Sequence, residues 1–253
     1  MIRSSRLVRD VCLGMTLLAA AGCGGSKSSS TSSSSQAAAD FDFGSNNPMK
    51  VTAFGDSITQ GFLELKRRDL RLITGNNYPN QLQGQLRGLD PAWTVVNRGV
   101  GGEETAPGLG RLPSVLAIDK SGFVLIMEGA NDATECLDAN FSANNLRQMV
   151  QIAKASKAIP IIGTGTPNFR NDPCGQDVSS KISVLVRGIA SAENIALAET
   201  YNGMNDRSLF GISPDRDPLH PNERGYRVMA DIWFQAMLQA IPGGTTTALR
   251  RRR

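Results

Sequence analysis

The chain has 253 residues, and its 27 Lys and Arg residues against 23 Asp and Glu residues give it a formal net charge of +4. Arg3, Arg6, Arg9 and Asp10 together contribute +2 of this charge and the four arginines at 250–253 contribute +4, so the remainder carries −2. A nearly neutral central part without any nucleic-acid-binding motif argues against a nucleic-acid partner.

Residues 1–22 have the pattern of an export signal. Three arginines precede an apolar stretch at residues 11–21, which is too short to form a transmembrane helix. Residues 20–23 resemble a bacterial lipoprotein lipobox, although Ala20 replaces the usual leucine. We therefore expect lipidation at Cys23 and a membrane-anchored lipoprotein that faces the periplasm or the cell surface. Ordinary signal cleavage, which would release a soluble secreted protein, is the alternative.

The next segment predicts a tether ahead of one folded domain. The Gly/Ser tract at 24–35 offers too little apolar surface to pack, so we expect a flexible linker over residues 23–47. A single monomeric domain is expected at 48–241, followed by a basic tail at 242–253. That tail could contact anionic lipid or polysaccharide, or could simply be solvated.

Five short apolar runs predict the strands of a parallel sheet. Runs of this kind, separated by longer amphipathic segments, are typical of strands that are buried on both faces. We expect an α/β fold with a five-stranded parallel sheet in a flavodoxin-like, three-layer α/β/α arrangement. The runs lie at residues 51–54, 94–97, 123–127, 159–162 and 195–198.

Three segments have the apolar spacing of helices. Residues 142–156 begin with a serine that could cap the helix, and residues 176–191 show a similar pattern. The last helix is expected to have Pro221 in its first turn. The side chains expected to face the core are Leu146, Met149, Val150, Ala153, Ile182, Leu185, Val186, Ile189, Val228, Ile232, Trp233 and Met237.

Residues 61–77 are the least regular segment between the predicted strands. Five Leu or Ile residues are mixed with four basic residues there. The segment is either a wall or lid of an acyl pocket, or an ordinary amphipathic surface element.

Four short motifs carry the candidate catalytic residues. Gly-Asp-Ser57, residues 97–102 and residues 128–132 each follow a predicted strand, and Asp217 stands three residues before His220. The carboxyl ends of parallel strands share one crevice, so these loops should face each other. A serine nucleophile needs an imidazole base, and His220 is the only histidine of the chain.

The order of these motifs resembles that of the SGNH, or GDSL, hydrolase family. The patterns are Gly-Asp-Ser, Asn-x-Gly-x-x-Gly, Gly-x-Asn-Asp and Asp-x-x-His, and the resemblance covers residues 50–240. It implies that Ser57 is the nucleophile, His220 the general base and Asp217 the group that orients the imidazole. It also implies an oxyanion hole made of the backbone N–H groups of Ser57 and Gly102 and the side-chain amide of Asn131.

Two nearby carboxylates need separate treatment. The resemblance makes Asp56 a residue that braces loops by hydrogen bonding rather than a second catalytic acid. Asp215 competes with Asp217 for the orienting role, but the spacing of the family motif favours Asp217.

Other chemistries fit the sequence less well. The Gly-x-Ser-x-Gly motif of α/β-hydrolases would need glycine where Thr59 stands. A dinucleotide-binding loop is disfavoured because Glu103 and Glu104 would repel a pyrophosphate. With one histidine and no clustered ligands, metal catalysis is not expected, and we expect no cofactor.

Two cysteines fall within the expected mature domain. Cys136 and Cys174 form an even pair in an exported protein, and both are expected in loops after strands. A disulfide between them would brace the rim of the site. Two free buried thiols are the alternative, since spacing alone does not fix the geometry.

The sequence thus predicts a serine esterase that forms an acyl-enzyme. The expected substrates are lipid, lysophospholipid or simple acyl esters, or thioesters. A carbohydrate O-acetylesterase acting on polysaccharide is the alternative enzyme, and a lipid- or glycan-binding lipoprotein is the alternative without activity.

Overall fold

The computed structural model describes residues 41–66, 69–72, 75–211 and 219–243. The expected export signal, Cys23, the Gly/Ser tract and Asp217 lie outside the described residues. The main sheet has five strands in the order β4-β1-β5-β6-β7, and every neighbouring pair is parallel. The strands are β1 (Asn47–Gly55), β4 (Thr94–Gly99), β5 (Ser121–Met127), β6 (Ile159–Gly163) and β7 (Ala196–Ala198). The predicted fold class and all five strands are confirmed.

Alternate side chains of the central strands pack into two separate apolar cores, one on each face of the sheet. Val51 and Ala53 of β1 belong to one apolar cluster, whereas Phe54 belongs to the other. Likewise Leu125 of β5 points into the first cluster and Ile126 into the second. This alternation follows from the two-residue period of a strand, and it explains why the central strands read as continuous apolar runs.

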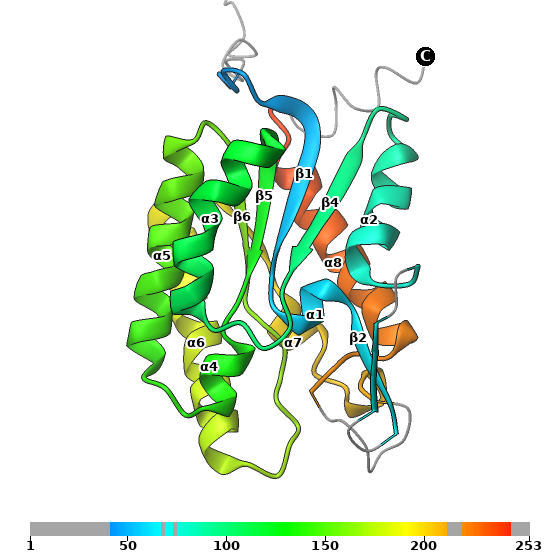
Figure 1. Ribbon diagram of the computed structural model, residues 1–253, viewed down its shortest axis with the longest axis vertical. Helices are drawn as coiled ribbons and strands as arrows, with labels where there is room; N and C mark the ends of the chain where they lie inside the picture. Colours follow the sequence, from blue (N-terminus) through cyan, green and yellow to red (C-terminus); the bar gives the residue numbers. More distant parts are fainter. Residues whose placement is uncertain (1–40, 67–68, 73–74, 212–218, 244–253) are drawn as a thin grey trace, which may run out of the picture. The chain divides into compact units, whose positions relative to one another are not determined.

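Five long helices cover the two faces of the sheet (Figure 1). On one face, α3 (Thr105–Asp119), α5 (Ala139–Ala155) and α6 (Pro173–Glu193) contribute buried side chains to a shared core. On the other, α2 (Tyr78–Arg87) and α8 (Glu223–Ala240) do the same. The result is the three-layer α/β/α arrangement expected from the sequence.

Short elements follow the strands at their carboxyl ends. They include α1 (Ser57–Gln60) after β1, α4 (Ala130–Thr134) after β5, and α7 (Thr200–Gly203) after β7, with a 3₁₀ turn at Arg207–Leu209. Strands β2 (Phe62–Lys66) and β3 (Asp69–Leu72) pair with each other as an antiparallel hairpin. The segment at 61–77, expected to be either a pocket wall or lid or an ordinary amphipathic surface element, therefore contains this hairpin.

The predicted start of the 142–156 helix is wrong by three residues. Helix α5 begins at Ala139, and its cap is Asp138, whose carboxylate accepts a hydrogen bond from the backbone N–H of Asn140. Ser142 lies inside the helix, where its hydroxyl donates to the carboxylate of Asp132 at 2.7 Å. The serine is therefore used in a tertiary contact rather than as a cap.

Two other helix starts also differ from expectation. Helix α6 begins at Pro173, three residues before the predicted start at 176. Helix α8 begins at Glu223, because the side chain of Asn222 caps it by accepting from the N–H of Gly225 at 3.0 Å. Pro221 consequently precedes the helix instead of lying in its first turn.

The predicted core positions are buried with three exceptions. Leu185, Val228 and Ile232 are only partly buried, and the other side chains expected to face the core are buried. Among the described residues, no helix has a stretch both long and apolar enough to cross a membrane.

Candidate active site

Ser57 lies at the sharp turn from β1 into α1. Asp56 caps this helix, because its carboxylate accepts a hydrogen bond from the N–H of Ile58 at 2.8 Å. Ser57 is the first helical residue, so its own N–H has no acceptor within the helix. The Ser57 residue is 8% exposed, which leaves it just accessible at the end of the strand.

His220 meets Ser57 although 163 positions separate them in the chain. Ser57 Oγ and His220 Nε2 are 2.9 Å apart, which is hydrogen-bonding distance, and His220 is 4% exposed. The backbone around the histidine is held by the N–H of Gly211, which donates to the carbonyl of His220 at 3.0 Å. A β-bridge between Phe210 and Pro221 fixes the same segment. The structure therefore brings together a serine and an imidazole in the geometry of a nucleophile and its base.

Asp217 lies within 212–218, outside the described residues. Its role as the residue that orients His220 stays a prediction, as does its preference over Asp215.

The end of β4 packs closely against α1. A Cβ atom on Gly99 would lie 2.1 Å from the backbone nitrogen of Gln60, so only glycine allows this approach. The side-chain amide of Asn97 also donates to the carbonyl of Thr59 at 2.8 Å. Gly102 follows with a φ angle of +79°, in the region that favours glycine. The N–H of the preceding residue, Gly101, donates to Gln60 Oε1 at 2.7 Å, so the backbone next to Gly102 is held against the helix that carries Ser57.

Asn131 lies in α4, directly after β5. Its Nδ2 atom donates a hydrogen bond of 2.8 Å to the backbone carbonyl of Glu103, the residue that follows Gly102. An amide has two N–H groups, and this bond accounts for one of them. Asn131 is consequently tied to the backbone next to Gly102. That these two groups and Ser57 together form an oxyanion hole stays a prediction.

Asp132 anchors this unit to the surrounding helices. It is fully buried and accepts hydrogen bonds from the backbone N–H of Thr105 at 2.8 Å, from the hydroxyl of Thr105 and from the hydroxyl of Ser142. Asn145 in turn donates to the hydroxyl of Thr105 at 3.0 Å. This network joins α3, α4 and α5, and no role was predicted from the sequence for most of its members.

Asp56 links two of the loops, as expected from the sequence. Besides Ile58, the N–H of Ala130 donates to its carboxylate, so α1 is tied to the start of α4. Burial raises the pKa of Asp56 from 3.8 to about 6, and the two backbone N–H donors and His220 only partly counteract that effect. The residue is a buried structural carboxyl beneath the site.

A family model for the GDSL-like lipase/acylhydrolase family matches residues 53–228. The chain therefore belongs to this family. The matched residues include Ser57, Gly102, Asn131 and His220, and the resemblance inferred from the four motifs is confirmed.

Known GDSL relatives cover most of the chain. Thioesterase 1/protease 1/lysophospholipase L1 of Escherichia coli is 33% identical over 189 residues, which cover 74% of this chain and 82% of that protein. Esterase TesA of Pseudomonas aeruginosa is 32% identical over 183 residues, covering 71% and 83% respectively. A carbohydrate acetylesterase from Sinorhizobium meliloti has the same fold, with a TM-score of 0.63 and 19% identity over 74% of this chain and 97% of that one. The protein is thus a GDSL-type hydrolase.

The first residue of the hairpin of this GDSL domain lies close to His220, the candidate base. The rings of Phe62 and His220 have centroids 6.3 Å apart, and the carbonyl of Phe62 accepts a hydrogen bond of 2.7 Å from the hydroxyl of Tyr226. A Cβ atom on Gly101 would lie 3.0 Å from the ring of Phe62. The start of segment 61–77 therefore stands between His220 and the loop of Gly102.

Cys136 and Cys174 are joined in a disulfide, with their Cα atoms 5.8 Å apart. Cys136 follows α4 closely, but Cys174 lies in the first turn of α6 rather than in a loop. The bridge therefore connects the short helix that carries Asn131 to one of the long helices.

Glu128, Arg111 and the ion pair of Arg111 with Glu103 were not predicted from the sequence. The guanidinium of Arg111 donates to the carboxylate of Glu103 at 2.8 Å and to the carbonyl of Arg98 at 3.0 Å. Glu128 is buried at the end of β5, although it is a charged residue directly after an apolar run. A charged residue directly after a buried apolar strand was the feature of the sequence that could have identified Glu128.

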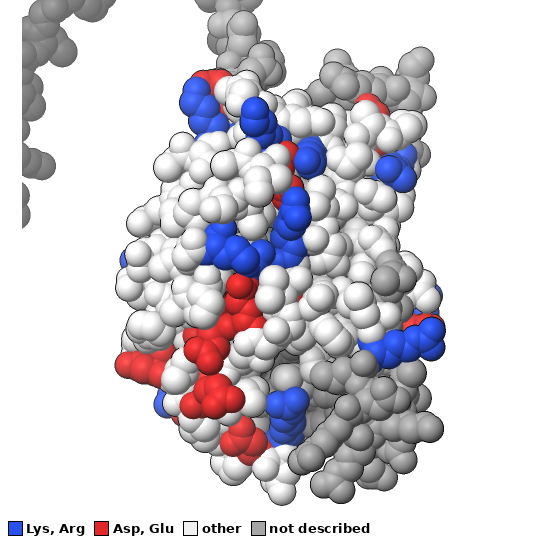
Figure 2. Space-filling view, viewed as in Figure 1, with Lys and Arg blue, Asp and Glu red and all other residues white. Residues whose placement is uncertain are grey.

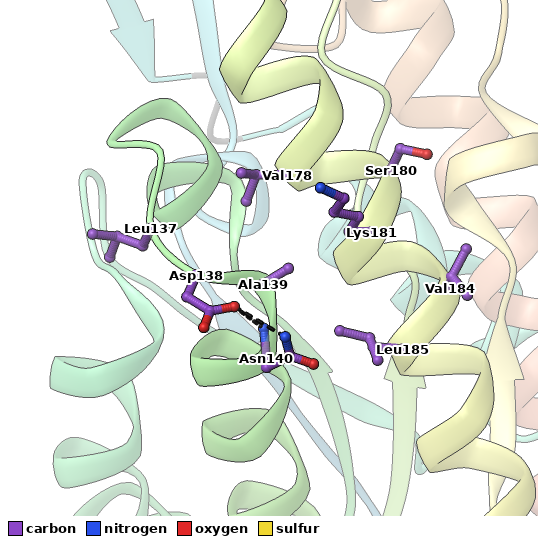
Figure 3. A pocket seen from close by; sticks show the side chains of 9 residues that line it. All are labelled: Leu137, Asp138, Ala139, Asn140, Val178, Ser180, Lys181, Val184 and Leu185. Atoms are coloured by element: carbon purple, nitrogen blue, oxygen red, sulfur yellow. Dashed lines mark hydrogen bonds between the residues drawn. The ribbon is translucent and has the colours of Figure 1, made fainter.

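A hollow of about 450 Å³ between α5 and α6 belongs to another part of the GDSL domain (Figure 3). Its apolar side chains come from Leu137, Val178, Val184 and Leu185, and Lys181 contributes a charge. None of the candidate catalytic residues lines it. Among the described residues, no cluster of His, Cys, Asp and Glu could hold a metal ion.

Proposed function

We propose that this protein is a serine esterase that hydrolyses carboxylic esters through an acyl-enzyme on Ser57. The observation that carries the proposal is the 2.9 Å approach of Ser57 Oγ to His220 Nε2. His220 takes the proton as Ser57 attacks the acyl carbon, and Asp217 holds the imidazole in the tautomer that can accept it.

The oxyanion of the tetrahedral intermediate is stabilised by three neutral donors. These are the backbone N–H groups of Ser57 and Gly102 and the remaining amide N–H of Asn131. His220 then returns its proton to the departing alcohol or thiol, which leaves the acyl group on Ser57. Water, deprotonated by the same imidazole, releases the acid and restores the serine.

We infer that the substrates are lipid, lysophospholipid or simple acyl esters, or thioesters. The names of the two sequence relatives support this range, since they include thioesterase, lysophospholipase and esterase. Phe62 adds an apolar ring next to His220, against which an acyl chain or an apolar alcohol can pack. Phe62, at the start of segment 61–77, then forms part of a wall of the acyl site.

The surface near the candidate catalytic loops carries several acidic side chains. Figure 2 shows Asp and Glu side chains gathered over α4 and the adjacent ends of α5 and α6. This is the end of the sheet at which the catalytic loops lie. A basic side chain lies beside these acidic side chains in the same view, so the charge of this surface is mixed and does not by itself select the acyl acceptor.

A carbohydrate O-acetylesterase is the second candidate function. It is favoured by the fold shared with the acetylesterase from Sinorhizobium meliloti and by the ring of Phe62, which would suit a short acyl group if it closes the site.

One substrate panel separates the two functions. Aryl and glycerol esters with acyl chains of graded length are compared with acetylated oligosaccharides under the same conditions. A value of kcat/KM that rises with chain length supports the lipid or simple ester substrate. A preference for acetylated sugars over acetyl esters of simple alcohols contradicts that substrate range. If no ester is hydrolysed in a Ser57-dependent way, the esterase proposal itself is wrong.

We also propose that the enzyme is exported and anchored to a membrane through lipidated Cys23. The basic start, the short apolar stretch and the residues 20–23 support this location. A linker of Gly and Ser residues would let the domain move above the membrane surface.

A further inference from the structure

Glu128 is a buried carboxyl group that the proposed mechanism does not use. It is 2% exposed, and neither of its oxygens has a hydrogen-bond partner among the described residues. Three charged residues interact electrostatically with Glu128: Asp56 before α1, Glu103 before α3 and Arg111 within α3. The charge of Glu128 also acts on the hydroxyl of Tyr78 in α2. The only cation among these groups, Arg111, is already paired with Glu103. As a carboxylate, Glu128 would therefore be buried without a partner of its own, which is costly.

The carboxyl groups of Glu128 and Glu103 both lie beside Gly108 of α3, and the two side chains interact with each other. A Cβ atom built on Gly108 would lie 3.3 Å from Glu128 Oε1 and 3.5 Å from Glu103 Oε2. Two carboxylates offer each other only acceptors, whereas a protonated carboxyl group has one O–H donor. A single proton thus turns an unfavourable contact into a charge-assisted hydrogen bond.

We propose that Glu128 holds a proton at neutral pH and donates it to the carboxylate of Glu103, and that this contact positions the oxyanion hole. Glu103 follows Gly102, and its carbonyl accepts the amide of Asn131, so it touches both presumed donors. Glu128 is then a positioning residue, and the inference rests on the proposed esterase mechanism. Burial raises the pKa of Glu128 well above its usual range, and the charges of Asp56 and Glu103 act in the same direction.

The arrangement has a consequence at alkaline pH. When Glu128 loses its proton, the O–H donor disappears and two carboxylates face each other, with Asp56 as a third negative group nearby. The loop of Gly102 and Glu103 then loses its support. We expect kcat to fall with rising pH while KM changes little, because the loop serves the transition state more than substrate binding.

The decisive variant is Glu128→Gln, which keeps the shape and an N–H donor but cannot ionise. Its kcat at pH 7 should lie within about threefold of wild type, and the alkaline decline of the wild-type kcat should be absent. Glu135→Gln, an exposed residue just after α4, is the matched control and should keep the wild-type profile. The proposal is wrong if Glu128→Gln retains the alkaline decline, or if it changes only KM.

A measurement on the wild-type protein covers the case in which the variant does not fold. Glutamate carboxyl groups are labelled with ¹³C, and infrared spectra are recorded at pH 8. A protonated carboxylic acid band that shifts with the label is expected, whereas Asp56 is unlabelled. The absence of such a band at pH 8 would overturn the proton assignment. If instead the wild type hydrolyses no ester while the band is present, the esterase mechanism fails and the proton on Glu128 stands without its catalytic role.

Discussion

The side-chain amide of Asn131 donates a hydrogen bond of 2.8 Å to the backbone carbonyl of Glu103. This bond joins the loop after β5 to the loop after β4, two segments that the sequence places 28 residues apart. Asn131 is therefore oriented by the same loop that carries Gly102. The two groups that would stabilise an oxyanion are positioned by each other and not only by the sheet.

Asn131→Ala should lower kcat by about a hundredfold or more, with a smaller change in KM, because a donor to the transition state is lost. Steady-state kinetics with a short-chain aryl ester measure both constants. Asn144→Ala, an exposed asparagine on α5, serves as the control and should retain the wild-type rate. An effect of Asn131→Ala on KM alone would contradict the oxyanion role.

Ser57→Ala should reduce kcat by about 10⁴-fold or more and leave the fold intact, since only the attacking hydroxyl is removed. A fluorophosphonate probe should label the wild type at Ser57, and mass spectrometry of the digested protein locates the modified residue. Ser191→Ala, which alters an exposed serine at the end of α6, should be labelled like wild type. Full labelling of Ser57→Ala would show that another residue is the nucleophile.

The free energy of unfolding should depend on pH through Asp56. Because its folded pKa of about 6 lies above the ordinary value of 3.8, the folded state favours the protonated form. This contribution is fully present below pH 3.8 and is lost as the pH rises through about 6, and it is on the order of 3 kcal/mol. Urea unfolding of wild type and Asp56→Asn between pH 4 and pH 8 measures it. The difference between the two proteins should shift in favour of the wild type as the pH falls, and a constant difference would disprove the assignment.

The strands and motifs were predictable from sequence because their causes are local. A strand buried on both faces must be apolar along its whole length, and the catalytic loops follow such strands. Helix α3 was not assigned, since Gly108, Gly110 and Pro113 lower its helix propensity while the burial of Leu112 and Leu116 favours it. Tertiary packing, which one sequence does not display, decided that element.

In the candidate site, too, some residues were predictable from the sequence and others were not. Ser57 and His220 could be paired because the chain has one histidine and a recognisable motif order. The contacts of Ser142 with Asp132 and of Arg111 with Glu103 join separate elements, so their partners could not be inferred from neighbouring residues. Glu128 could have been noticed as a charge after an apolar strand, but its burial needed the structure.

Replacing both Cys136 and Cys174 by alanine should lower the free energy of unfolding by about 2–4 kcal/mol, because the bridge closes a loop of 38 positions in the unfolded chain. Denaturant unfolding of the oxidised wild type and the double variant measures the difference. Peptide mapping of exported protein without reductant should recover the cross-linked pair. Two freely alkylated thiols in that material would rule out the bridge as the native state.

Cys23→Ser should release the protein from the membrane fraction or leave it as an unprocessed precursor, because the proposed lipid attachment site is lost. Fractionation and N-terminal sequencing of both proteins in a bacterial host test this. The domain's esterase rate in detergent extract should be unchanged and is the control. A wild-type protein that is fully soluble, with a mature end other than Cys23, would contradict the anchor and favour ordinary signal cleavage.

The candidate nucleophile and its base are synthesised at different times, because they lie far apart in the chain. Ser57 is synthesised 163 residues before His220, and the helix after His220 must dock on α2, where Trp233 stacks on Tyr78 with ring centroids 5.8 Å apart. Until that final helix has been made and packed, the growing polypeptide has a serine but no imidazole beside it. If Ser57 and His220 act as proposed, a nascent chain that still lacks His220 cannot hydrolyse esters, and hydrolysis begins only after the C-terminal part of the domain has been synthesised and has folded.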